Sequence, residues 1–171
     1  MSGFQQSVNQ SNPLAVAGDF ASANPRVMVI AGEHQLVAGD SGLTVGRFAW
    51  ISGDKVNNSG TAIVPDGFVH REQQGMITTY LAEGSNVIPA GFGVSLLKKA
   101  DVFISPINAA SIGHKVYAKY ETGTNTVDTL GAPVGSSYCS TTGASISHYI
   151  ETSYVGYTAC DTNELLIASN W

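Results

Sequence analysis

The serine of Gly39-Asp40-Ser41-Gly42 stands in a context that a serine hydrolase can use for its nucleophile. Such a nucleophile needs a histidine base that removes its proton. Only His34 precedes this serine, and the C-terminal part of the chain contains no Asp-x-x-His sequence. Because that base is missing and the four residue types are those of a tight turn, we interpret the segment as a turn.

The sequence also contains no complete metal-binding or cofactor-binding motif. His70-Arg71-Glu72 offers the His-x-Glu of zinc deaminases, but the Pro-Cys-x-x-Cys partner is missing. The histidines and cysteines show no metal-ligand spacing; they are His34, His70, His114, His148, Cys139 and Cys160. Gly91-Phe-Gly93 lacks the rest of a dinucleotide fingerprint. We therefore expect no metal, no cofactor and no enzyme activity. The paired carboxylates of a glycosidase meet only in space, so the sequence leaves that chemistry open.

Cys139 and Cys160 could form a disulfide. The N-terminus MSGFQQSVNQSN has neither a basic region nor an apolar region of a secretory signal. Without a secreted context, cysteines are kept reduced, and we expect two unpaired thiols.

Charge is scarce in these 171 residues: Asp, Glu, Lys and Arg make up 12%, about half of the roughly 25% of a typical soluble domain. The net charge of −5 and the scattered basic residues argue against a nucleic-acid partner. Apolar runs such as 27–31 are far too short to span a membrane. A charge-poor surface of small residues fits a protein that works inside an assembly, and it also fits a secreted, glycine-rich β-protein.

The elements that must position these residues are short apolar runs separated by turn residues. They are rich in Val, Ile, Thr, Tyr and Phe, and we expect about ten strands, at 27–31, 35–38, 45–51, 77–81, 87–88, 92–97, 116–120, 125–130, 145–151, 154–160 and 165–168. Spacing of this kind predicts an all-β sandwich or barrel. Residues 72–83 also fit helical spacing, although Gly75 and the threonines 78–79 favour a strand. By length, the chain forms a single domain.

Residues 1–26 differ from the rest and predict an extended N-terminal arm ahead of a β-domain at 27–171. The arm is polar and charge-poor, and Pro13 and Pro25 each follow an asparagine, which disfavours helix. A frayed terminus is the alternative interpretation. Against it, Phe20 and the apolar residues 14–16 favour contact with a surface.

Three stretches carry a family resemblance. They are GFVHREQQGMITTYLAEGSNVIPAG (67–91), AGDFASANPR (17–26) leading to VGRFAW (45–50), and KVYAK (115–119). Together they resemble the structural cement proteins of tailed bacteriophages, over residues 14 to about 120. The segment 136–160 has no counterpart in this resemblance.

The resemblance implies a single-domain, jelly-roll-like β-sandwich that decorates the outside of the assembled phage head. Its implied partners are the phage major capsid protein and further copies of itself, as a homodimer or homotrimer near local symmetry axes. The implied location is the outer capsid surface of the virion, after synthesis in the host cytoplasm. No catalysis is implied.

Two groups of residues are candidates for the capsid interface. In the arm these are Pro13, Phe20, Asn24, Pro25 and Arg26, with Phe20 as an apolar anchor and Arg26 as a capsid-facing cation. Phe20 could equally pack on the protein's own core. The second group is His70, Arg71, Gln73 and Gln74, which suit hydrogen bonding at an interface rim. A solvated hairpin loop explains the second group equally well.

A carbohydrate-binding or adhesion module on the virion surface is the alternative function. Lectins share the β-sandwich fold, and Trp50, Trp171 and seven tyrosines could supply stacking platforms for sugar rings.

Overall fold

The computed structural model describes residues 15–60, 63–72, 86–120, 134–141 and 148–171. Within these ranges the chain contains thirteen strands and no helix, which confirms the all-β prediction. The jelly-roll assignment stays a prediction. The predicted strands at 77–81 and 125–130, Gly75 and most of the helical alternative at 72–83 lie outside the described residues.

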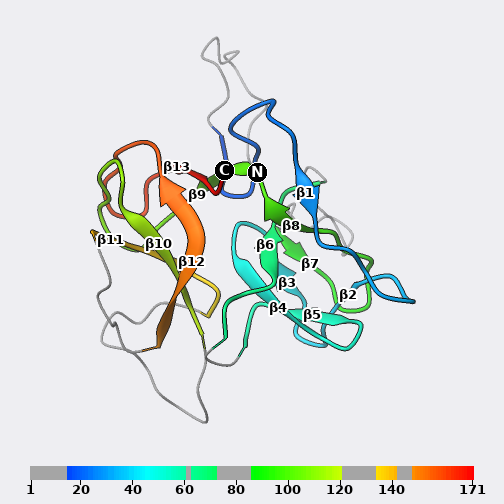
Figure 1. Ribbon diagram of the computed structural model, residues 1–171. Helices are drawn as coiled ribbons and strands as arrows, with labels where there is room; N and C mark the ends of the chain where they lie inside the picture. The colour runs from blue at the N-terminus through cyan, green and yellow to red at the C-terminus, as the bar shows by residue number, and fades with distance from the viewer. Residues whose placement is uncertain (1–14, 61–62, 73–85, 121–133, 142–147) are drawn as a thin grey trace, which may run out of the picture.

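The strands form two larger sheets that lie side by side in Figure 1 and a small two-stranded one. In spatial order the first sheet contains β1 (Val27–Met28), β8 (Leu96–Lys99), β6 (Gly67–Val69), β4 (Phe48–Ser52), β5 (Lys55–Asn57) and β2 (Val37–Ala38). The second contains β11 (Ser137–Ser140), β10 (Lys115–Lys119), β12 (Tyr149–Gly156), β13 (Leu166–Ser169) and β9 (Asp101–Ile104). The third pairs β3 (Leu43–Thr44) with β7 (Val87–Ile88). The neighbours pair antiparallel, except that β2 and β5 are parallel.

The six-stranded sheet is buried on both faces because both alternating sets of its side chains are apolar. In β4, Phe48 and Trp50 face the core shared with the five-stranded sheet, while Ala49 faces a second core that includes Leu43 of β3. In β6 and β8, Phe68 and Leu97 face the first core, and their chain neighbours Val69 and Leu96 face the second core. The molecule therefore has three layers, with this sheet in the middle.

A single residue, Ala100, carries the chain from one large sheet to the other. It lies between β8 and β9 and is fully buried. The side chain of Asn170 bonds the backbone on both sides of this crossover: its Nδ2 donates to the Lys98 carbonyl at 2.6 Å, and its Oδ1 accepts from the Ala100 N–H at 3.0 Å. These two bonds replace ladder hydrogen bonds where the strand changes sheets, which keeps buried backbone groups satisfied.

The sequence located several strands correctly and missed others. β10 lies at Lys115–Lys119, one residue from its prediction, whereas the separate strands expected at 145–151 and 154–160 meet in the single strand β12. The sequence also missed β3, β5, β6, β9 and β11. Their four or fewer residues are too short to establish a two-residue period.

Cys139 and Cys160 are free thiols in the structure. Cys139 is buried in the first core, and burial raises its pKa to about 12. Cys160 is half-buried beside that core.

Candidate functional site

The two candidate regions, far apart in sequence, meet in space because residues 18–21 of the predicted arm pack along β9. Phe20 forms an antiparallel bridge with Val102, the Gly18 N–H donates to the Phe103 carbonyl at 2.8 Å, and the Phe103 N–H donates to the Asp19 carbonyl at 2.9 Å. Gly18 has a φ of +99°, and a Cβ there would lie 2.6 Å from Val45 Cγ1. Glycine is thus required for this close approach.

His70 and Arg71 follow β6 directly and contact this part of the arm. The rings of Phe20 and His70 lie 5.2 Å apart, and the Arg26 guanidinium lies 3.4 Å from the Phe20 ring centroid. This stack of cation, ring and imidazole combines apolar packing with a cation–π contact. Phe20 also packs against the first core, so one of its two predicted environments, the protein's own core, is present; its role as a capsid anchor stays a prediction.

Charged groups secure the same junction. Arg71 Nη1 lies 3.5 Å from Asp19 Oδ1, and the Arg71 N–H donates to the Gly18 carbonyl at 2.9 Å. His70 Nε2 lies 3.1 Å from Glu72 Oε1. We call the group Asp19, Phe20, Arg26, His70, Arg71 and Glu72 the arm junction.

His70 is 5% exposed, and its Nδ1 has no hydrogen-bond partner among the described residues. Burial lowers the pKa of His70 because the charged imidazolium loses hydration. The Glu72 carboxylate opposes this shift, and Arg26 adds to it. The geometry therefore favours a neutral imidazole beneath the arm.

This state of His70 predicts that acid weakens the fold. Its pKa is lower in the folded chain than in the unfolded chain, so between the two values the unfolded state binds more protons. The contribution of neutral His70 to the free energy of unfolding is complete above about pH 7 and is lost as the pH falls below about 6.5. The free energy of unfolding then falls by at most about 1.4 kcal/mol per pH unit. Urea unfolding between pH 5 and 8 measures this. In the His70→Gln variant, the free energy of unfolding should depend less on pH than in the parent protein. Equal pH dependence in both proteins would contradict this prediction.

The remaining predicted residues divide into two groups. Asn24 and Pro25 are exposed, and Asn24 Nδ2 donates to Asp101 Oδ2 at 2.6 Å. Pro13, Gln73 and Gln74 lie outside the described residues. The interface roles of all these residues stay predictions.

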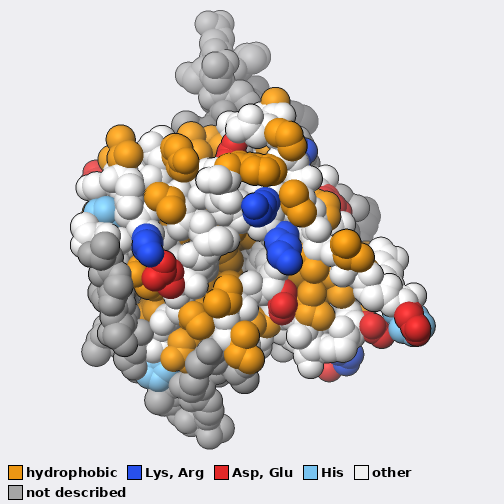
Figure 2. Space-filling view, viewed as in Figure 1, with side chains coloured by type: hydrophobic (Ala, Val, Ile, Leu, Met, Phe, Trp, Pro, Cys, Tyr) orange, Lys and Arg blue, Asp and Glu red, His pale blue; other side chains and the backbone are white. Residues whose placement is uncertain are grey.

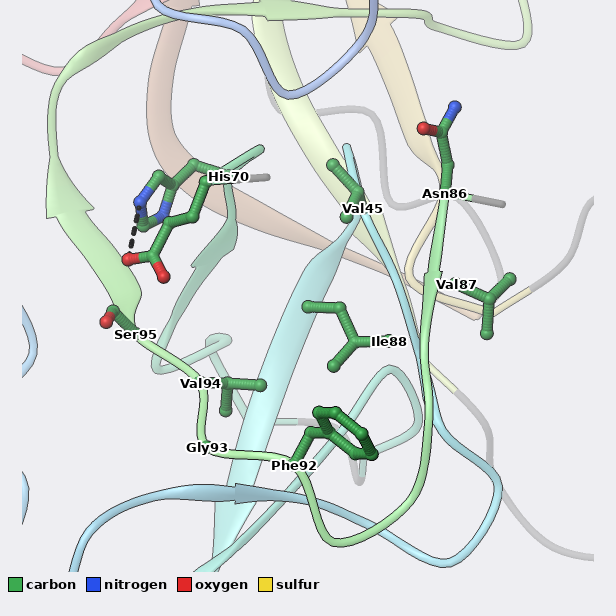
Figure 3. A pocket seen from close by; sticks show the side chains of 10 residues that line it. Val45, His70, Asn86, Val87, Ile88, Phe92, Gly93, Val94 and Ser95 are labelled. Carbon is green, nitrogen blue, oxygen red and sulfur yellow. Dashed lines mark ion pairs between the residues drawn. The ribbon is translucent and has the colours of Figure 1, made fainter. Parts of the chain in front are cut away.

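A cavity of about 70 Å³ lies next to the arm junction (Figure 3). Val45, Ile88, Phe92 and Val94 form its apolar wall, and Figure 3 shows His70 and its contact with Glu72 at one side of it. Its volume suits little more than one small side chain.

The sequence missed an exposed apolar ridge that follows the arm junction. Val27 and Met28 in β1 are each 39% exposed, and Ile30 is 93% exposed. β1 lies at the end of the six-stranded sheet, so its outer edge has no neighbouring strand among the described residues. The apolar run 27–31 suggested a buried strand, and no local signal distinguishes an edge strand from a central one. Figure 2 shows hydrophobic side chains spread over one face of the molecule among few charged ones.

The segments considered for catalysis have structural roles. The Gly42 N–H donates to the Gly39 carbonyl at 2.9 Å, which closes the predicted turn, and Asp40 pairs with Lys55 at 2.8 Å. No group of three potential metal ligands occurs in the part of the chain that the structure describes. Over the same described residues, no helix is long and apolar enough to cross a membrane.

Comparisons with known proteins agree on one class. The family model of the XM1 gp53 minor capsid protein matches residues 4–169, and no curated protein matches. A chain of the solved capsid of Myoviridae phage XM1 has the same fold, with a TM-score of 0.57 and 16% identity over 98% of this chain and 96% of that one. Because the family model covers nearly the whole sequence, the chain belongs to the XM1 gp53 minor capsid protein family, a family of phage capsid structural proteins.

Proposed function

We propose that this protein is a cement protein that binds the outer surface of the assembled phage head across junctions between major-capsid subunits. The observation that carries the proposal is the family match over residues 4–169. The charge-poor surface and the ridge of Val27, Met28 and Ile30 support it, because depletion of charge is typical of the centre of protein interfaces. We assign no catalytic role to the chain.

The ridge is the surface that we assign to the major capsid protein. Its position after Arg26 places exposed apolar residues next to a cation that is fixed over the Phe20 ring. A cation held in this way loses little side-chain freedom on binding. The outer edge of β1, which pairs with no strand among the described residues, also suits the addition of a strand from the partner.

The wider interface includes the arm, residues 1–26, and the exposed part of the patch around Arg71. Asn24 and Pro25 connect the packed part of the arm to the ridge, so contact by the arm and contact by the ridge form one surface. Copies arranged as dimers or trimers around symmetry axes multiply modest contacts. A clamp that binds only assembled subunits stabilises the shell by mass action.

Reconstitution on heads that lack the protein tests this function. Purified protein should sediment with assembled heads at a saturating ratio, should not bind unassembled major capsid protein, and should raise the temperature at which heads release DNA, measured with a DNA-binding dye. Absence of binding, or equal binding to unassembled subunits, would contradict a cement role. Binding without a change in the DNA-release temperature would reduce the role to decoration.

A further inference from the structure

A second surface hollow lies where the end of β12 and strand β13 meet residues 21–24. It has a volume of about 270 Å³ and combines aromatic rings with hydrogen-bonding side chains. Its relevant lining residues are Tyr157, Trp171, Ser22, Asn24, Asp101 and Ser169. We call it the aromatic groove, and all of its lining residues lie in the described part of the chain.

The two aromatic residues are unusual in their exposure. Tyr157 is 57% exposed and Trp171 is 55% exposed, whereas Trp50 is 6% exposed, covers Gly60 and donates its indole N–H to the Ile63 carbonyl at 2.7 Å. Tyr117, Tyr149 and Tyr154 are buried. Among the described residues, Phe92 is also half-exposed, but it lines the other cavity, whereas Tyr157 and Trp171 lie in one groove. Exposure of large rings has a hydration cost that a ligand can remove.

The polar side is held in a fixed arrangement. Asp101 Oδ2 accepts hydrogen bonds from Ser22 Oγ and from Asn24 Nδ2. Burial alone would raise the pKa of Asp101, but hydrogen bonds from Ser169, Ser22 and Asn24 lower it, so the carboxylate is ionised at neutral pH. Its remaining acceptor capacity, together with the hydroxyls and the amide, suits a ligand that carries several hydroxyl donors. Such preorganisation lowers the entropy cost of binding.

Lys99 completes the surroundings of Trp171. Its Nζ lies 5.6 Å from the Trp171 ring centroid. This contact helps to fix the indole.

We infer that the aromatic groove binds the ring of a saccharide. A pyranose has apolar C–H faces that pack on aromatic rings and a rim of hydroxyls that pair with carboxylates and amides, and the groove presents both kinds of group together. The binding itself does not depend on the cement role; only its use on a virion does, where many copies convert weak binding into avidity.

The test uses the full-length soluble protein and a panel of glucose, galactose, mannose, rhamnose, N-acetylglucosamine and N-acetylgalactosamine. Saturation-transfer NMR and chemical-shift titration of the Trp171 indole signal should detect at least one sugar with a Kd on the order of 1 mM, as expected for a small ligand in a shallow site. Trp171→Ala and Tyr157→Ala should each weaken this binding at least tenfold. Phe92→Ala is the matched control, because Phe92 is 50% exposed but lines the other cavity, and it should leave the Kd unchanged.

Three results would overturn the inference: no binding by any sugar of the panel, binding that Trp171→Ala leaves intact, or loss of head binding in Trp171→Ala without any sugar binding by the parent protein. The last result would assign the groove to the capsid contact. Thermal unfolding of each variant shows that the fold is retained. Failure of the parent protein to bind heads, with sugar binding intact, would contradict the cement role alone.

Discussion

Replacement of Phe68 by alanine is expected to lower the free energy of unfolding by about 3–5 kcal/mol, a large share of the stability of a typical domain. Phe68 is fully buried in the core between the two larger sheets. Its ring lies 5.4 Å from that of Phe48 and 6.2 Å from that of Tyr154, so one side chain joins neighbouring strands of one sheet to the central strand of the other. The truncation leaves a cavity at the contact of the layers, where rigid neighbours on both sides limit collapse.

Urea denaturation followed by tryptophan fluorescence measures this loss. Phe92→Ala removes the same side chain from a half-exposed position and should cost less than about 1 kcal/mol. A loss of equal size in both variants would contradict the packing of the two sheets through Phe68. If Phe68→Ala does not fold, Phe68→Leu, which retains most of the volume, should show a smaller loss in the same direction.

The second large effect concerns binding and not stability. Ile30→Asp is expected to weaken attachment to heads by about 30-fold or more, the loss that corresponds to a hot-spot energy of about 2 kcal/mol. Because Ile30 is 93% exposed, a carboxylate at this position leaves the folded protein intact but buries a charge when the ridge meets the capsid. Sedimentation of labelled protein with heads at several concentrations gives the apparent Kd.

Ile112→Asp makes the matched control. Ile112 is 72% exposed and lies in the connection between β9 and β10, away from β1 in the sequence and outside the ridge. The substitution adds the same charge to another apolar surface position, so binding should change less than about twofold if the ridge is the contact. Equal losses in both variants would mean that net charge, and not the ridge, controls attachment. Unchanged binding by Ile30→Asp would remove the ridge from the interface.

Individual strands show which parts of the fold can be predicted from the sequence. In β10, Lys-Val-Tyr-Ala-Lys lies in a sheet, within one residue of the predicted bounds, because alternation is encoded locally. β9 escaped prediction although Val102 and Ile104 alternate with Asp101 and Phe103, since Ala100 joins it to β8 without any turn residue. A change of sheet without a turn leaves no mark in composition. β12 shows the opposite case: Thr152 and Ser153 are residue types common in loops, yet they lie inside one continuous strand.

Residue types and short spacings by themselves determined that this protein is all-β, charge-poor and without the partner residues of the catalytic motifs considered. Tertiary structure decided which of its apolar and aromatic residues face solvent. Phe20 and Ile30 are both apolar residues near the N-terminus, yet Phe20 packs between Arg26 and His70 while Ile30 is almost fully exposed. Trp50 is buried and Trp171 is not. Such differences depend on strand order and on which edge remains unpaired, and these arise from contacts between distant residues, which no local pattern encodes.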